Sequence, residues 1–146
     1  KCRIFTESEF CSICSNEKRD KSNICVVESV SDVFAIEQSN QFNGNYFILH
    51  GHLSPIDDIG PEELALDKLF KLAKSEEVKE LILATNSTLE GETTSHYIHD
   101  YLKDLEGLKL TKLAQGVPLG GELEYVDRGT IMHAFNGRVE LKDLSE

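Results

Sequence analysis

Cysteines near the start of the chain have the spacing of a metal site. Cys11 and Cys14 form a CxxC pair, and eight residues separate Cys2 from Cys11. Two thiolates in one tight turn can hold a tetrahedral zinc ion. The surrounding segment, 1–22, is short and polar with little apolar periodicity, so it needs an ion to fold. These residues are therefore predicted to form part of a zinc finger.

The fourth zinc ligand has two candidates. Cys25 is one, but it lies in the apolar run Ile24–Glu28, where a cysteine usually packs as a small hydrophobic residue. The other is a cysteine three positions before Cys2, which a finger built from two CxxC pairs requires. We favour the second candidate. Cys2, Cys11 and Cys14 are then three of four zinc ligands, with the fourth upstream of this sequence.

Acidic and polar residues follow two of the predicted strands. Glu28 ends the first strand, and the loop after the third contains Asn86, Thr88, Glu90 and Glu92. Parallel strands present their carboxyl ends at one edge of a sheet, so the three carboxylates are expected to converge. Mg²⁺ is bound by carboxylate oxygens from separate loops. The pattern indicates either a Mg²⁺ site or acids that are merely solvated at strand ends.

Histidines and glycines suggest weaker alternatives. His50 and His52 flank a glycine but have no third ligand of matching spacing. The other histidines fall in predicted helices and are interpreted as polar-face residues: His96, His99 and His133. The loop Gly116–Gly121 resembles a phosphate cradle, yet no Lys-Ser/Thr follows and GxGxxG is absent. Loop geometry is the preferred explanation for its glycines.

Alternating strands and helices must position these groups. Apolar periodicity and turn signals predict strands at 24–28, 46–49, 80–85 and 108–114, and helices at 29–38, 61–75, 91–105 and 122–135. Residues 138–141 are expected to add an edge strand. Ser31 and Asp32 are candidate caps of the first helix. The alternation predicts an α/β fold with a mainly parallel sheet and helices on both faces.

Composition restricts the class of protein. A chain of 146 residues, 40% of them apolar, is long enough for a compact domain with a hydrophobic core. Its apolar runs are strand-sized and no signal-like leader opens it, so we expect a cytoplasmic protein without membrane contact. The net charge of −11 is opposite to that of a free-standing nucleic-acid binder. The acidity either confers solubility only or meets a basic protein partner.

Several blocks keep their order and spacing along nearly the whole chain. They are 2–7 with 11–14, 19–20 with 24–29, 50–55, 59–61, 83–86 with 90–92, and 116–127. Together they resemble the RecR family of bacterial recombination mediators. Its members share a helix-hairpin-helix DNA-binding region, a four-cysteine zinc finger, a Toprim domain and a C-terminal segment.

The resemblance implies a division of the chain. Residues 1–22 correspond to a partial zinc finger, 23–115 to the Toprim domain, and 116–146 to a C-terminal segment expected to serve oligomerisation. It also implies that Cys25 is a strand residue and not a ligand. The helix-hairpin-helix region and the first zinc cysteine are expected to lie outside this sequence. DNA is expected to bind mainly to that helix-hairpin-helix region.

The Toprim resemblance bears on catalysis. Active Toprim enzymes keep a glutamate after the first strand and a DxDxD motif after the third, and these hold Mg²⁺. Glu28 matches the glutamate, but the three aspartates become Asn86, Thr88 and Glu90. Hard cations depend on that negative charge, so only weak Mg²⁺ binding is expected. We therefore assign the loops of Glu28, Glu90 and Glu92 to partner binding.

The resemblance also implies a function. The protein is expected to be a non-enzymatic mediator that works with RecO, and in some settings RecF, to load RecA onto single-stranded DNA covered by SSB. It would do so as a ring-like homodimer or homotetramer that can encircle DNA. Two alternatives stay open. One is a Mg²⁺-dependent Toprim nuclease, which the missing aspartates disfavour, and the other is an oligomerisation module only.

Overall fold

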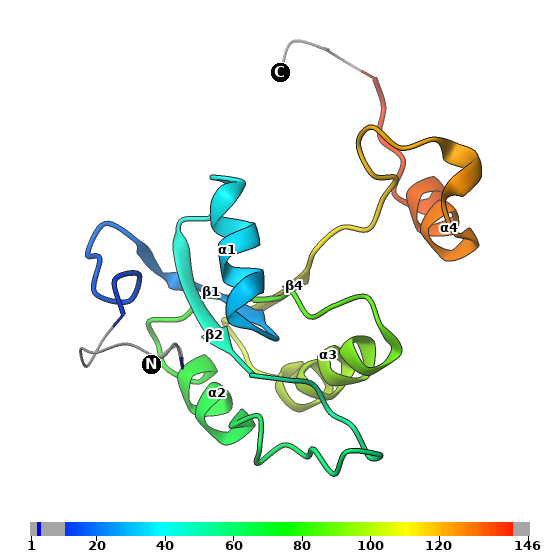
Figure 1. Ribbon diagram of the computed structural model, residues 1–146. Coiled ribbons are helices and arrows are strands. Elements are labelled where there is room, and N and C mark those ends of the chain that lie inside the picture. The colour runs from blue at the N-terminus through cyan, green and yellow to red at the C-terminus, as the bar shows by residue number, and fades with distance from the viewer. Residues whose placement is uncertain (1–2, 4–10, 142–146) are drawn as a thin grey trace. The chain divides into compact units, whose positions relative to one another are not determined.

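This computed structural model describes Arg3 and residues 11–141. The chain divides into two compact units, Lys1–Lys112 and Leu113–Glu146. In the first unit strands and helices alternate: β1 (Asp20–Val27), α1 (Val30–Gln38), β2 (Gly44–Ile48), α2 (Leu66–Ala73), β3 (Glu80–Leu83), α3 (Leu89–Leu102) and β4 (Lys109–Lys112) (Figure 1). None of the helices in the described residues is long and apolar enough to cross a membrane.

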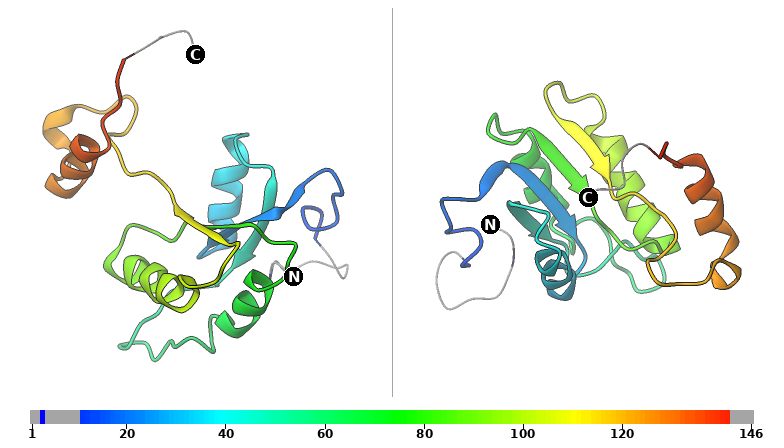
Figure 2. Two further views of the ribbon diagram at one scale, coloured as in Figure 1. Left: turned by 180° about the vertical axis from the view of Figure 1, so that it is seen from behind. Right: turned by 90° about the horizontal axis from the view of Figure 1, so that it is seen from above.

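The four strands form one parallel sheet in the order β2-β1-β3-β4. Figure 2 shows them side by side in the view from above. In the centre, Cys25 of β1 is paired with Tyr46 of β2 on one side and with Ile82 of β3 on the other. The loops that follow β1 and β3 therefore begin next to each other. The predicted α/β fold with a parallel sheet is confirmed.

Helices cover both faces of the sheet because β1 is apolar on both sides. Ile24 and Val26 pack with α2 and α3, whereas Cys25 and Val27 pack with α1. Figure 1 shows α1 on one face of the sheet and α2 and α3 on the other. This alternation follows from the two-residue period of a strand, which sends successive side chains to opposite faces. The core therefore has two halves, one on each face.

Cys25 lies deep in the smaller half of this core. Only 2% of its surface is exposed, and burial raises the pKa of its thiol to about 12. Its side chain belongs to the apolar layer between the sheet and α1, where a cysteine packs as a small hydrophobic residue. The prediction that Cys25 is a core strand residue is confirmed.

The start of α1 agrees with the prediction within one residue but its cap differs, and α2 begins later than predicted. The cap of α1 is Ser29, not Ser31: the Ser29 hydroxyl accepts from the backbone N–H of Asp32, and the Asp32 carboxylate accepts from that of Ser29. The helix predicted from residue 61 begins only at Leu66. Ala65 has a φ of 55°, a left-handed conformation that no regular helix can include.

β2, β3 and β4 lie within about two residues of their predicted bounds, whereas β1 begins at Asp20, four residues before its predicted start. α3 begins at Leu89 and not at residue 91, because the Thr88 hydroxyl caps it by accepting from the Gly91 N–H at 3.0 Å. It ends at Leu102, three residues early, and β4 is limited to Lys109–Lys112. Fraying ends of elements are the part that periodicity determines least.

The second unit contains a short 3-10 turn, η1 (Leu123–Tyr125), and a helix, α4 (Arg128–Asn136). The single helix predicted for 122–135 is therefore wrong. The predicted helix breaks before Asp127 because the carboxylate of this residue accepts a hydrogen bond from the Thr130 N–H at 3.0 Å and caps a new helix. The edge strand expected at 138–141 is also wrong, since these residues are irregular.

A network of three side chains fastens α1 to the sheet. The Arg19 guanidinium donates two hydrogen bonds to the Glu37 carboxylate, at 2.7 and 3.0 Å, and the Tyr46 hydroxyl donates a third. The hydrogen bonds from Arg19 hold the pKa of Glu37 below its usual value. Glu37 thus remains ionised in the folded protein at a pH where the unfolded chain is already partly protonated.

We predict that this network makes stability depend on pH. Because the pKa of Glu37 is lower in the folded than in the unfolded chain, its contribution is complete above the unfolded value, about 4.3. The contribution is lost as pH falls through the folded value. Glu37→Gln should cost about 1–3 kcal/mol at pH 7 and much less at pH 3, measured by urea unfolding. The exposed Glu76→Gln is the matched control; an equal loss at both pH values for Glu37→Gln would contradict the prediction.

Candidate functional site at the carboxyl edge of the sheet

Glu28 directly follows β1 and is 6% exposed. Its Oε1 accepts a hydrogen bond from His52 Nδ1 at 3.0 Å, and its Oε2 accepts one from the backbone N–H of Asn86 at 2.6 Å. Its own carbonyl accepts from the N–H of Gly51 at 3.0 Å. Glu28 therefore connects the end of β1 with the loop after β2 and with the turn after β3. Each carboxylate oxygen accepts one hydrogen bond from the protein.

The turn after β3 is organised by its polar side chains. The Thr85 hydroxyl donates to the carbonyl of Gly91 at 2.9 Å, and the Thr88 hydroxyl caps α3. Asn86 meets Glu28 through its backbone and not through its side chain. At the positions where active Toprim enzymes carry aspartates, Asn86 and Thr88 thus contribute a backbone donor and a helix cap.

Gly91 lies at the closest approach between this turn and Glu28. A Cβ atom added to Gly91 would lie 2.0 Å from the carbonyl oxygen of Asn86 and 3.0 Å from Glu28 Oε2. The first distance is far inside van der Waals contact with rigid backbone. Only glycine lets the first turn of α3 pass so close to the strand ends.

The two other acids do not join Glu28 in one cluster. Glu90 is exposed on the first turn of α3, and the Glu92 side chain, 40% exposed, forms an ion pair with Lys112 of β4. Residues two apart on a helix point roughly 200° away from each other. Among the described residues, the ligating oxygens of Glu28, Glu90 and Glu92 form no group within 4.8 Å. The expected convergence of the three carboxylates was therefore wrong, because Glu90 and Glu92 flank Gly91, the residue of α3 that lies against Glu28.

This geometry limits the chemistry of the edge. Mg²⁺ requires several oxygens around one point and usually keeps some of its waters. The buried carboxylate of Glu28 already has two donors, and the exposed acids lie elsewhere on α3. In the described residues the edge holds an internal hydrogen-bond network beneath an acidic surface, without a set of converging carboxylates.

The CxxC pair lies in a turn that precedes β1. The backbone N–H of Cys14 donates to the Cys11 sulfur at 3.3 Å, and the N–H of Ser15 donates to the Cys11 carbonyl at 3.0 Å. Cys11 is buried and Cys14 half-buried. Two cysteines held in one tight turn fit the donor set of a zinc site. Cys2, the third predicted ligand, lies outside the described residues.

The contacts of His52, His50 and Arg3 at this edge were not predicted from the sequence. His52, considered there only as a metal ligand, instead donates to Glu28, while His50 Nε2 lies 2.6 Å from the carbonyl oxygen of Arg3. The Arg3 guanidinium donates to the carbonyls of Ile48 and Leu49 and, at 2.8 Å, to that of Leu64. No local pattern indicates the Arg3 contacts, because they join positions more than 40 residues apart in the sequence.

Sequence comparisons identify the family to which this geometry belongs. The profile of the Toprim domain matches residues 22–114, and the profile described as RecR, C-terminal, matches residues 116–139. The chain is 50% identical to the recombination protein RecR of Coxiella burnetii over 142 residues, 97% of this chain and 70% of that protein. The chain belongs to the RecR family.

Other relatives agree. The chain is 55% identical to the recombination protein RecR of Xylella fastidiosa over 140 residues, 96% of this chain and 70% of the relative. The chain is 54% identical to the recombination protein RecR of Hahella chejuensis over 138 residues, 94% of this chain and 68% of the relative. The resemblance read from the sequence blocks is confirmed, and the parallel sheet at this edge is that of a Toprim domain.

We predict that Glu28 is required for stability. Glu28→Gln keeps the shape of the side chain, but an amide cannot accept from both His52 and the Asn86 N–H. A buried donor left unsatisfied costs about 1–3 kcal/mol. Chemical denaturation should show that loss for Glu28→Gln and a change within about 0.5 kcal/mol for the exposed Glu90→Gln. Equal stability of the two variants would mean that the buried network contributes nothing.

We also predict that Gly91 tolerates no side chain. In Gly91→Ala the new methyl group meets the backbone of Asn86, so either α3 or the turn must shift, which should cost about 1–3 kcal/mol. Gly116→Ala is the control, because nothing lies within 4 Å of its Cβ position. Thermal unfolding should separate the two variants by several degrees; a Gly91→Ala protein as stable as the control would disprove the close approach.

Proposed function

We propose that this chain acts in recombinational DNA repair as a non-catalytic mediator. It would work in the cytoplasm with RecO, and in some settings RecF, to load RecA onto SSB-covered single-stranded DNA. The proposed absence of catalysis rests on the hydrogen bonding of the Glu28 carboxylate. Both of its oxygens accept hydrogen bonds from the protein itself, from His52 and from Asn86. A Mg²⁺-dependent nuclease would need that carboxylate free, with further acids beside it.

Charge supports a basic protein partner at the same edge. The net charge is −11, and exposed acids lie on the loop after β2 and at the start of α3: Asp57, Asp58, Glu62, Glu63 and Glu90. The side chain of Ile56, 95% exposed in that loop, adds an apolar contact among the acids. Complementary charge speeds encounter and selects the partner. We therefore assign RecO contact to the exposed acids, Glu90 and Glu92 among them, rather than to the buried Glu28.

Zinc would complete the segment before β1. Cys11 and Cys14 fit as two of its ligands, with Cys2 as a third, and the ion would organise a segment that lacks an apolar core. Its role is structural in this proposal. Direct contact with DNA is assigned mainly to parts of the family's proteins outside the segment matched here.

Self-association is the remaining part of the proposal. Neither η1 nor α4 buries a side chain of its own. Large apolar side chains are instead exposed in this unit: Leu123, Tyr125, Met132 and Phe135. A unit of this size without a core needs a further surface to cover those side chains. We propose that it contributes to the homodimer or homotetramer from which a ring around DNA would be built.

We predict that Glu90→Lys with Glu92→Lys weakens RecO binding by at least about tenfold, or about 1.4 kcal/mol. The reason is that two attractive charges become repulsive to a basic partner. Isothermal titration calorimetry of the full chain with RecO at low salt measures the effect, and added salt should weaken the wild-type interaction. Glu92 is paired with Lys112, so circular dichroism must first show that the variant is folded.

The matched control carries the same two charge reversals at the opposite edge of the sheet. Glu76 and Glu77 are adjacent and exposed, and they lie in the turn before β3. Their double replacement by lysine should leave RecO affinity within about twofold, which separates a local contact from the effect of net charge. Equal affinity of both double variants and the wild type would place the contact elsewhere.

A further inference from the structure

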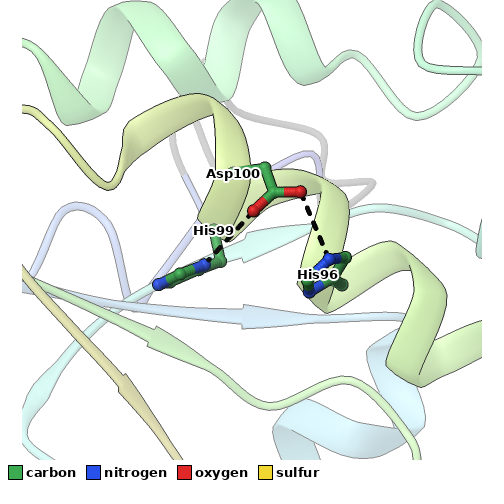
Figure 3. Close-up of side chains that lie close together, drawn as sticks. All are labelled: His96, His99 and Asp100. Carbon is green, nitrogen blue, oxygen red and sulfur yellow. Dashed lines mark ion pairs between the residues drawn. The ribbon is translucent and has the colours of Figure 1, made fainter.

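One face of α3 brings three metal-binding side chains to a single point. His96, His99 and Asp100 occupy positions i, i+3 and i+4 of the helix, which lie on one side of it. His96 Nε2 is 3.2 Å from one carboxylate oxygen of Asp100, and His99 Nδ1 is 3.7 Å from the other. Figure 3 shows the carboxylate between the two imidazoles, with one nitrogen of each ring directed toward it.

Within the described residues, these three form the one group of at least three such side chains whose ligating atoms all lie within 4.8 Å of each other. Ligands of one tetrahedral zinc ion, at about 2.0–2.2 Å from the metal, are roughly 3.4 Å apart. The side chains of His96, His99 and Asp100 are 75%, 52% and 52% exposed. Small rotations of such exposed side chains can close the remaining gap without moving the helix.

The surroundings leave room for an ion and for a further ligand. His96 and His99 line a cavity of about 240 Å³ between α3 and β4, together with Glu92, Thr111 and Lys112. Lys112 holds the carboxylate of Glu92, so this acid is not counted among the ligands. β4 is an edge strand of the sheet, and the cavity therefore opens where another molecule can approach.

We propose that His96, His99 and Asp100 bind a divalent transition-metal ion of the Zn²⁺, Ni²⁺ or Co²⁺ class. Two imidazole nitrogens and one carboxylate oxygen suit these borderline ions and do not suit Mg²⁺ or Ca²⁺, which prefer oxygen. Three protein ligands leave at least one coordination position for water or for a donor from a partner. This site is separate from the cysteines before β1 and from Glu28, and does not depend on the role proposed for either.

Nickel is the probe that distinguishes this site. The full chain first receives one equivalent of Zn²⁺, which the thiolates of the cysteines take up in preference to imidazole and carboxylate, and Ni²⁺ is then added up to one equivalent. The paramagnetic ion broadens NMR signals near it, and the chain contains five histidines whose imidazole signals can be assigned by substitution. We expect the signals of His96 and His99 to broaden first, with those of His50, His52 and His133 unaffected. Mg²⁺ at the same concentration should change none of the five.

Substitutions make the test quantitative. His96→Gln and Asp100→Asn should each weaken Ni²⁺ binding by at least about tenfold in calorimetry. Replacing a residue that only hydrogen-bonds a metal ligand already lowers metal affinity by about that factor. The control His133→Gln removes an exposed histidine from α4 and should bind like the wild type. Ni²⁺ should also raise the melting temperature of the wild type and of the control, but not that of His96→Gln with His99→Gln.

Two results would overturn the proposal. Broadening of all five imidazoles to a similar degree would mean adventitious surface binding only. Ni²⁺ binding that survives replacement of both His96 and His99 would place the ion elsewhere. All three ligands are exposed, so their replacement should leave the fold intact, and circular dichroism of each variant checks this.

Discussion

The buried carboxylate of Glu28 is the constraint on which the edge of the sheet depends. A charged group with 6% exposure is tolerated only when hydrogen-bond donors replace the water it has lost. His52 and the Asn86 N–H supply those donors from two different loops. The loop after β2 must fold back over the end of β1, and the turn after β3 must come close enough to require glycine at position 91.

This arrangement supports the proposal that the chain keeps a Toprim fold without Toprim chemistry. In a metal-binding relative the same carboxylate would face an ion and further acids, whereas here a histidine and a backbone N–H take that place. The remaining acids of the edge are directed outward, where their charge is available to another protein. The Glu28 carboxylate thus fixes the loops internally, and the exposed acids of α3 and the loop after β2 are those to which we assign partner contact in our proposal.

Much of this architecture was predictable because the spacing of apolar residues indicates which segments are strands and which are helices. β1 is apolar on both faces, which indicates a central strand between two layers of helices, and Cys25 belongs to that pattern. Caps were less predictable. Ser29 and Ser31 are equivalent in type and lie two residues apart, and only the direction in which the chain leaves β1 selects Ser29. Likewise, the left-handed conformation of Ala65 delays α2, although the residues before it favour a helix.

By itself, the sequence determined the family, the order of strands and helices, and the position of Glu28 at the end of β1, since these depend on residue type and spacing along the chain. The tertiary structure alone decided what Glu28 does. Whether a carboxylate meets a metal, a solvent molecule or a histidine depends on groups 24 and 58 residues away. It likewise separated Glu90 and Glu92 from Glu28, and it brought Asp100 close to His96 and His99, which line a cavity beside β4. Such contacts follow from the packing of whole elements, which residue spacing does not encode.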